Sequence, residues 1–151
     1  MYRRIKVIAM KLQSLPCYCA TLRQAARAVT TLYEGVLADS GLHATQYTVL
    51  QVLTRVSNLT TTQIADAIGI DQTTATRTLA LVRKSGLVMD APGSDRRERR
   101  WVLTAAGEGV VRKLNPAWEA AQRAFEKRIG RLEAAALKKA CHSAAAKLVA
   151  S

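Results

Sequence analysis

Apolar positions near the start of the chain recur with the period of an amphipathic helix. Between residues 19 and 40 they lie three or four positions apart, at Leu22, Ala25, Val29, Leu32 and Val36. Gly41 is expected to end this helix, because glycine readily adopts the left-handed conformation that follows a helix. A second helix is predicted over Thr45–Val56, where Tyr47, Leu50 and Leu53 recur every three residues.

Two short helices are predicted next, and they meet at a glycine. Thr60 and Gln63 have the spacing of a capping box at the start of the first helix, which Gly69 ends. Asp71 is expected to cap the second helix, which runs to about Ser85. Two capped helices joined by a tight turn containing glycine are typical of a helix-turn-helix.

A β-hairpin is predicted directly after these helices. Leu87–Ala91 and Arg99–Thr104 have the composition of strands, and Pro92-Gly93-Ser94-Asp95 between them is typical of a turn. A basic hairpin in this position is the wing of a winged helix. The predicted fold is therefore mainly α, a winged helix-turn-helix with a small hairpin and flanking helices at both ends.

The C-terminal third returns to a helical pattern. Apolar residues recur every seven positions, with two more between them: Val111, Trp118, Phe125 and Leu132, then Leu114 and Ala121. Such a stripe suits contact with a partner helix. Pro116 is expected to kink or split this helix. A last helix, over about Leu132–Val149, aligns Leu137, Cys141, Ala144 and Leu148.

Composition narrows the class of protein. The 151 residues carry a net charge of +12, which indicates an anionic partner such as nucleic acid. No apolar run reaches the roughly 18 residues of a membrane span, and Val7–Met10 is too short for a signal peptide. Only residues 45–104 resemble a DNA-reading unit, yet they carry just +3 of the charge. The arrangement of the basic residues is therefore more informative than their number.

The second helix of the pair is the candidate recognition helix for the DNA major groove. Ala75, Thr78, Leu79 and Val82 share one face and are expected to pack inward. The other face carries residues suited to contacting bases or phosphates: Gln72, Thr73, Thr74, Thr76 and Arg77. Arg83 and Lys84, at the end of the helix, are further candidates. The alternative is that Thr73 and Thr74 only support the helix start.

The hairpin tip concentrates positive charge. Asp95-Arg96-Arg97-Glu98-Arg99-Arg100 places four arginines in six positions. Arg96 and Arg97 are predicted to reach into the minor groove, where the potential is most negative. Asp95 is expected to orient an arginine, because a carboxylate repels phosphate. The alternative is a charged hairpin that is merely solvated.

These stretches together resemble the MarR family of transcription regulators. The matching residues begin with Leu59-Thr60, Ile64-Ala65 and Gly69-Ile70, and continue with Thr76-Arg77 and Val82-Arg83-Lys84-Ser85-Gly86-Leu87-Val88. They end with Asp95-Arg96-Arg97 and Val102-Leu103-Thr104-Ala105-Ala106-Gly107. The likeness covers about residues 17–149, and Asp-Arg-Arg followed by Leu-Thr-x-x-Gly is its most specific part.

The resemblance implies a single MarR-like domain over residues 1–151, acting as a homodimer on a pseudo-palindromic DNA operator. Residues 17–44 and 105–151 would form the dimer, and residues 45–104 the DNA-binding lobe. It also implies that a small ligand or an oxidant weakens DNA binding. We expect a cytoplasmic repressor that needs no cofactor. The alternative is a low-specificity architectural DNA-binding protein, whereas no residue set typical of an enzyme is found.

The first cysteines resemble those of the branch of this family that senses organic hydroperoxides. In that branch a cysteine at the start of the first helix is peroxidatic, and a tyrosine fourteen residues later hydrogen-bonds it. Cys19 and Tyr33 have this spacing, whereas Ala44 replaces a second supporting tyrosine. Cys17 or the partner's Cys141 would form a disulfide with Cys19. The alternatives are a buried, inert Cys141 and a Cys17-x-Cys19 metal site, for which the ligand set is incomplete.

Three aromatic residues are candidates for a ligand pocket. Tyr33, Tyr47 and Trp118 are predicted at the junction between the dimer helices and the DNA-binding lobe. Aromatic walls with a few polar groups suit a small aromatic ligand, such as a phenolic acid. The alternative is that all three are ordinary core residues.

Overall fold

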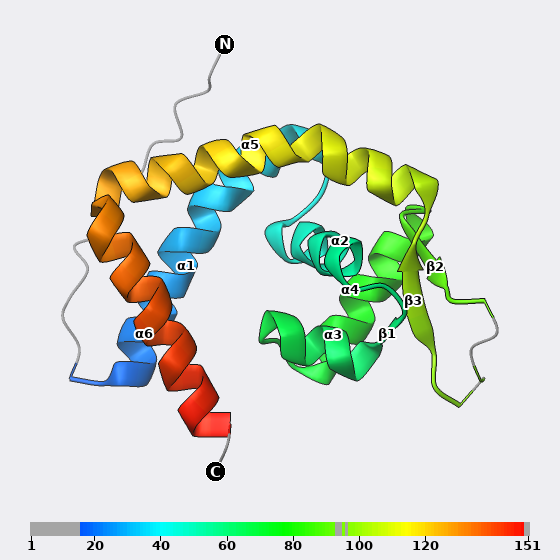
Figure 1. The fold of residues 1–151 in the computed structure, drawn as a ribbon, viewed down its shortest axis with the longest axis horizontal. Helices are drawn as coiled ribbons and strands as arrows, with labels where there is room; N and C mark the ends of the chain where they lie inside the picture. Colours follow the sequence, from blue (N-terminus) through cyan, green and yellow to red (C-terminus); the bar gives the residue numbers. More distant parts are fainter. Residues whose placement is uncertain (1–15, 93–94, 96, 150–151) are drawn as a thin grey trace.

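The computed structural model describes residues 16–92, 95 and 97–149. Figure 1 shows a winged lobe connected to a pair of terminal helices by one long helix. The helices are α1 (Tyr18–Leu37), α2 (Ala44–Arg55), α3 (Thr61–Ile68), α4 (Gln72–Lys84), α5 (Ala105–Ile129) and α6 (Arg131–Val149), with a short 3₁₀ helix η1 (Ala38–Ser40). The strands are β1 (Leu59–Thr60), β2 (Val88–Asp90) and β3 (Arg100–Leu103). The predicted mainly helical winged fold is confirmed.

The winged lobe closes around an apolar core made by α2, α3, α4 and the sheet. Its fully buried members include Val49, Leu50, Ile64, Leu79 and Val82. The capping box at the start of α3 is present, and Gly69 ends that helix with a φ of 72°. These local signals fix the turn between α3 and α4, and so the direction in which α4 leaves the core.

The wing is a three-stranded antiparallel sheet in the order β1-β3-β2. The prediction of a two-stranded hairpin missed β1, in which Leu59 and Thr60 pair with Trp101 and Arg100 of β3. Thr60 belongs to this strand and also caps α3. The sheet therefore joins the wing directly to the start of the helix-turn-helix.

Helix α5 runs unbroken through Pro116 and arches over the molecule from the wing to α6 (Figure 1). Of the kink or split predicted at Pro116, the split is wrong. Both Pro116 and Arg112, whose carbonyl loses its helical partner there, lie on the exposed surface. Water can therefore satisfy the carbonyl that the proline leaves without a donor.

A second apolar cluster ties α5 to α1 and α2. Its buried members are Tyr33, Leu37, Ala44, Tyr47 and Ala121, with Trp118 packed against them. Beyond this cluster the terminal helices have little cover in the single chain, and α6 packs mainly on α5. No helix in the described ranges has the length and apolar character needed to cross a membrane.

Candidate nucleic-acid interface

The recognition helix α4 begins at a well-formed cap. Asp71 accepts the backbone N–H of Thr74 at 2.9 Å and the Thr74 hydroxyl at 2.6 Å, as its position before the helix predicted. These hydrogen bonds from Thr74 lower the pKa of the Asp71 carboxyl. The cap fixes the first turn of α4, which carries most of the candidate base-contacting residues.

The two faces of α4 separate as predicted. Ala75, Thr78, Leu79 and Val82 are buried. The opposite face exposes Gln72, Thr73, Thr74, Thr76 and Arg77.

Two of the exposed hydroxyls already have local partners. Besides the bond from Thr74 to Asp71, the Thr76 hydroxyl donates to the Gln72 carbonyl at 2.8 Å. The side chains of Gln72 and Arg77 make no hydrogen bond or ion pair with the described residues, so their donors are available to DNA. Thr74 thus has the supporting role that the alternative interpretation gave it, in addition to its exposure.

Asp90, at the end of β2, links the recognition helix to the wing. Its carboxylate forms ion pairs with Arg83 of α4 at 3.2 Å and with Arg99, which precedes β3, at 2.8 Å. Sequence reasoning overlooked Asp90, because its two partners lie seven and nine residues away on different elements. Arg83 and Lys84, both predicted to contact DNA, are both exposed, and Arg83 in addition ties α4 to the wing through Asp90.

The other wing arginines divide into structural and available groups. Arg99 lies over the Trp101 ring, with 5.6 Å from its guanidinium carbon to the ring centroid. Arg100 donates to Glu98 at 3.0 Å and to the Asn58 carbonyl at 3.1 Å. Arg97 is exposed, and its guanidinium makes no contact of this kind within the described part of the wing. Arg96, predicted to work beside it, lies outside the described residues.

Two further contacts shape the wing. The Trp101 indole N–H donates to the Thr61 hydroxyl at 3.0 Å, which attaches β3 to the first residue of α3. Asp95 accepts the backbone N–H of Arg97 at 3.0 Å. Asp95 therefore holds the backbone of Arg97, and no pair between its carboxylate and a guanidinium is found among the described residues.

The three cysteines are all exposed in the single chain. Cys19 lies in the first turn of α1, as predicted, and the Arg23 guanidinium donates to its sulfur at 3.6 Å. Tyr33 is fourteen residues further along the same helix, which places it about 21 Å away at 1.5 Å per residue. The two cannot meet within one chain. The alternative of a buried Cys141 is wrong for the single chain, and the described residues contain no cluster of three or more metal-binding side chains.

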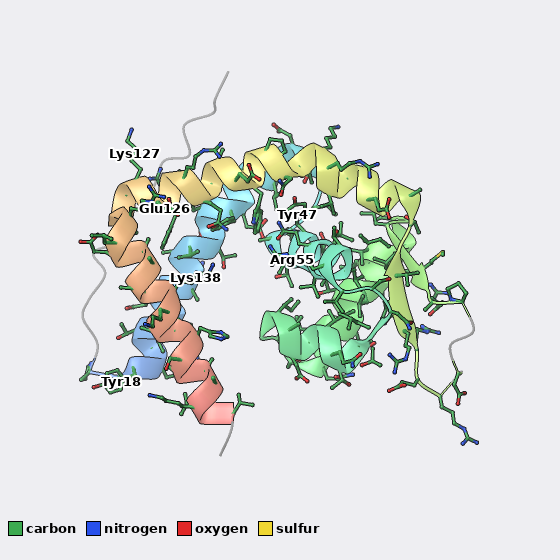
Figure 2. All side chains as sticks on the ribbon, in the orientation of Figure 1. Tyr18, Tyr47, Arg55, Glu126, Lys127 and Lys138 are labelled. Atoms are coloured by element: carbon green, nitrogen blue, oxygen red, sulfur yellow. The ribbon has the colours of Figure 1, made fainter. Side chains whose placement is uncertain are left out.

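A cavity of about 180 Å³ lies where α1, α2 and α5 meet the turn between α3 and α4. Its lining consists of Val29, Thr30, Tyr33, Ala44, Thr45, Thr48, Ile68, Ile70 and Trp118. Two of the three predicted pocket residues therefore line it. Tyr47 does not: it is fully buried behind Trp118, at 4.8 Å between ring centroids, and lies beneath α5 (Figure 2).

Burial shapes the chemistry of the two tyrosines. It raises the pKa of the Tyr33 phenol, and the nearby Glu126 carboxylate raises it further. Burial likewise raises the pKa of Tyr47, whose hydroxyl donates to the Val111 carbonyl at 3.4 Å. Both phenols are therefore neutral hydrogen-bonding groups near neutral pH.

A capped recognition helix with an exposed polar face, followed by a basic three-stranded wing, defines a winged helix-turn-helix DNA-binding protein. Residues 40–98 match the model of the MarR family. The chain is similar to the transcriptional regulator MosR of M. tuberculosis, with 33% identity and a TM-score of 0.70, over 85% of this chain and 97% of that one. It is also similar to MosR in complex with DNA, with 34% identity and a TM-score of 0.68, over 85% and 98% of the two chains.

Two further comparisons extend the likeness. YwoH of Bacillus subtilis, described as an uncharacterised HTH-type transcriptional regulator, is 29% identical over 94 residues, which are 62% of this chain and 69% of YwoH. NadR in complex with 4-hydroxyphenylacetate shares the fold, with 22% identity and a TM-score of 0.76, over 89% of this chain and 98% of that one. The chain belongs to the MarR family and is a DNA-binding transcriptional regulator.

Proposed function

We propose that the protein acts as a homodimeric repressor on a pseudo-palindromic operator. Each protomer would place α4 in the major groove and the arginines at the wing tip in the adjacent minor groove. The observation that carries this proposal is that some arginines of the wing hold its structure while another is left exposed. Arg99 and Arg100 are held by Asp90, Glu98 and the backbone, and so fix a wing on which Arg97 is left exposed for DNA.

The homodimer is supported by apolar side chains on the terminal helices that the described part of one chain leaves exposed. Tyr18 is 91% exposed, Leu22 52% and Leu132 82%. Figure 2 shows Tyr18 at the outer end of α1, far from the winged lobe. A second copy covering these helices would bury this apolar surface, and its two-fold symmetry would match two half-sites.

The cavity supports release of DNA by a small aromatic ligand. Its walls come from both parts of the molecule: Tyr33 from α1 and Trp118 from α5, and Ile68 and Ile70 from the end of α3 and the turn that leads into α4. A ligand that binds better when these parts are differently spaced would shift the protein away from the DNA-binding arrangement. NadR, which shares the fold, holds an aromatic ligand.

Oxidation is the second route to release, and the exposed Cys19 and Cys17 support it. The Cys19 thiolate would attack an organic hydroperoxide, forming a sulfenic acid while the peroxide is reduced to an alcohol. The thiol of Cys17, or that of the partner's Cys141, would then condense with it to a disulfide and release water. Cys19→Ser should abolish peroxide-induced release of DNA, and continued release in that variant would eliminate this route.

Selection of genomic DNA fragments by the purified protein tests the proposed function. We expect the selected fragments to share an inverted repeat with half-sites about one helical turn apart, occupied by two protomers. Repeating the selection with a hydroperoxide should deplete these fragments. Enrichment of fragments without a common repeat, or binding of one protomer per site, would contradict the proposal.

A further inference from the structure

The polar side-chain groups that line the cavity are uncharged. They are the hydroxyls of Thr30, Thr45, Thr48 and Tyr33 and the indole N–H of Trp118, and the lining contains no lysine, arginine or histidine. The Tyr33 side chain is 9% exposed, and its hydroxyl makes no hydrogen bond within the described part of the chain. The cavity therefore offers neutral donors and acceptors, and no cation that would pair with an anionic ligand.

Two carboxylates lie close to residues of the lining. The Glu34 carboxylate accepts the backbone N–H of Ala44, a lining residue, at 2.8 Å. Its second oxygen lies 3.3 Å from Nδ1 of His43, so this imidazole already has a carboxylate partner. Glu126 acts on the buried Tyr33 from α5 and raises its pKa. A ligand carboxylate placed here would be desolvated without a partner and repelled by these groups.

The shape of the cavity limits the ligand further. Tyr33 and Trp118 form one wall, with ring centroids 4.4 Å apart and ring planes inclined by 47°. The volume of about 180 Å³ is slightly larger than the roughly 150 Å³ of an engineered cavity that binds benzene. A single aromatic ring with a short substituent therefore matches the size, and the two rings offer it an aromatic contact.

We propose that this cavity takes an uncharged ligand with one aromatic ring and a hydroxyl or amide group, and rejects the carboxylate analogue of the same ligand. This rests on the proposed function, because it names the class of effector that would act there. It also separates this chain from NadR, whose bound ligand is an aromatic carboxylate. The sequence predicts a phenolic acid as one ligand, and we propose a neutral ring in its place because the described lining contains no cation.

The test uses the 151-residue protein without DNA and two probes that differ in one group. Isothermal titration at neutral pH compares 4-hydroxyphenylacetamide with 4-hydroxyphenylacetate, which are close in shape but differ in charge. We expect the amide to bind at least about tenfold more tightly, since the carboxylate would lose its hydration without gaining a partner. Equal affinities, tighter binding of the carboxylate, or no binding of either probe would overturn the proposal.

A matched pair of variants places the effect at the cavity. Thr30 lies on the exposed side of the lining, so a longer side chain can be accommodated there. Thr30→Arg should remove most of the preference for the amide, whereas the neutral Thr30→Gln should keep it. A preference that is the same in both variants would contradict the charge argument.

Binding of the amide without release of DNA would leave this inference intact and would refute only the proposed role of the ligand as an effector. Release of DNA by carboxylates alone would overturn this inference and would leave the proposed role of a ligand as effector intact.

Discussion

The wing arginine Arg97 gives the sharpest prediction about DNA binding. Its guanidinium is exposed and unengaged among the described residues, so Arg97→Ala removes a charge without breaking a contact that holds the wing. Each phosphate charge neutralised by a protein contributes about 0.9 to the slope of log affinity against log salt. At about 0.15 M salt this is roughly a 5-fold loss of affinity per protomer, and about 30-fold for a dimer.

Fluorescence anisotropy with the operator, repeated at several salt concentrations, measures both quantities. We expect a slope shallower by about 1.8 and an unchanged melting temperature. Arg123→Ala is the matched control, because it removes the same charge from α5, where Arg123 lies 3.9 Å from Glu119. An Arg97→Ala variant with the affinity and slope of the wild type, or with no more effect than Arg123→Ala, would refute the assignment of the wing to DNA.

Three further predictions concern the folded state. Gly107→Ala should lower the free energy of unfolding by about 1–3 kcal/mol in urea titrations, because a Cβ there meets the backbone carbonyl of Leu87, between α4 and β2. Gly109→Ala should be neutral or stabilising, because a Cβ there makes only an ordinary contact with the Arg112 side chain at 3.9 Å. Thr61→Val should cost about 1–3 kcal/mol by leaving the buried Trp101 N–H without an acceptor, and an unchanged midpoint would contradict this contact. The folded state lowers the pKa of Asp71, so the ionised carboxylate stabilises the protein above pH about 4 and loses this effect as the pH falls further. The difference in melting temperature between the wild type and Asp71→Asn should therefore shrink below that pH. A difference that stays constant with pH would refute the cap.

The features that the sequence predicted well are those set by neighbouring residues. The cap at Asp71, the capping box of Thr60 and Gln63, and the left-handed glycines at positions 41, 69 and 86 all depend on contacts within a few positions. The inward face of α4 followed from the helical period alone. Such local signals place α4 and the wing in order along the chain, and this order was enough to predict the winged fold.

The features that the sequence did not predict depend on contacts between distant residues. Strand β1 is two residues long and exists because it pairs with β3, about forty positions later. Asp90 forms ion pairs with Arg83 of α4 and with Arg99 of the wing, and these pairs connect the two elements. Tyr47 was grouped with Tyr33 and Trp118 on residue type, but the packing of α5 buries it behind the cavity wall. No single-sequence pattern encodes these choices.

The central claim is that specificity comes from the arrangement of α4 and the wing and not from the excess charge of the chain. Nine of the twelve net charges lie outside residues 45–104, and an architectural protein would use them without regard to sequence. The most direct measurement is a competition between the selected operator and random duplex DNA of equal length at rising salt. We expect operator binding to persist at salt concentrations that abolish binding to random DNA. Loss of both at the same concentration would contradict it.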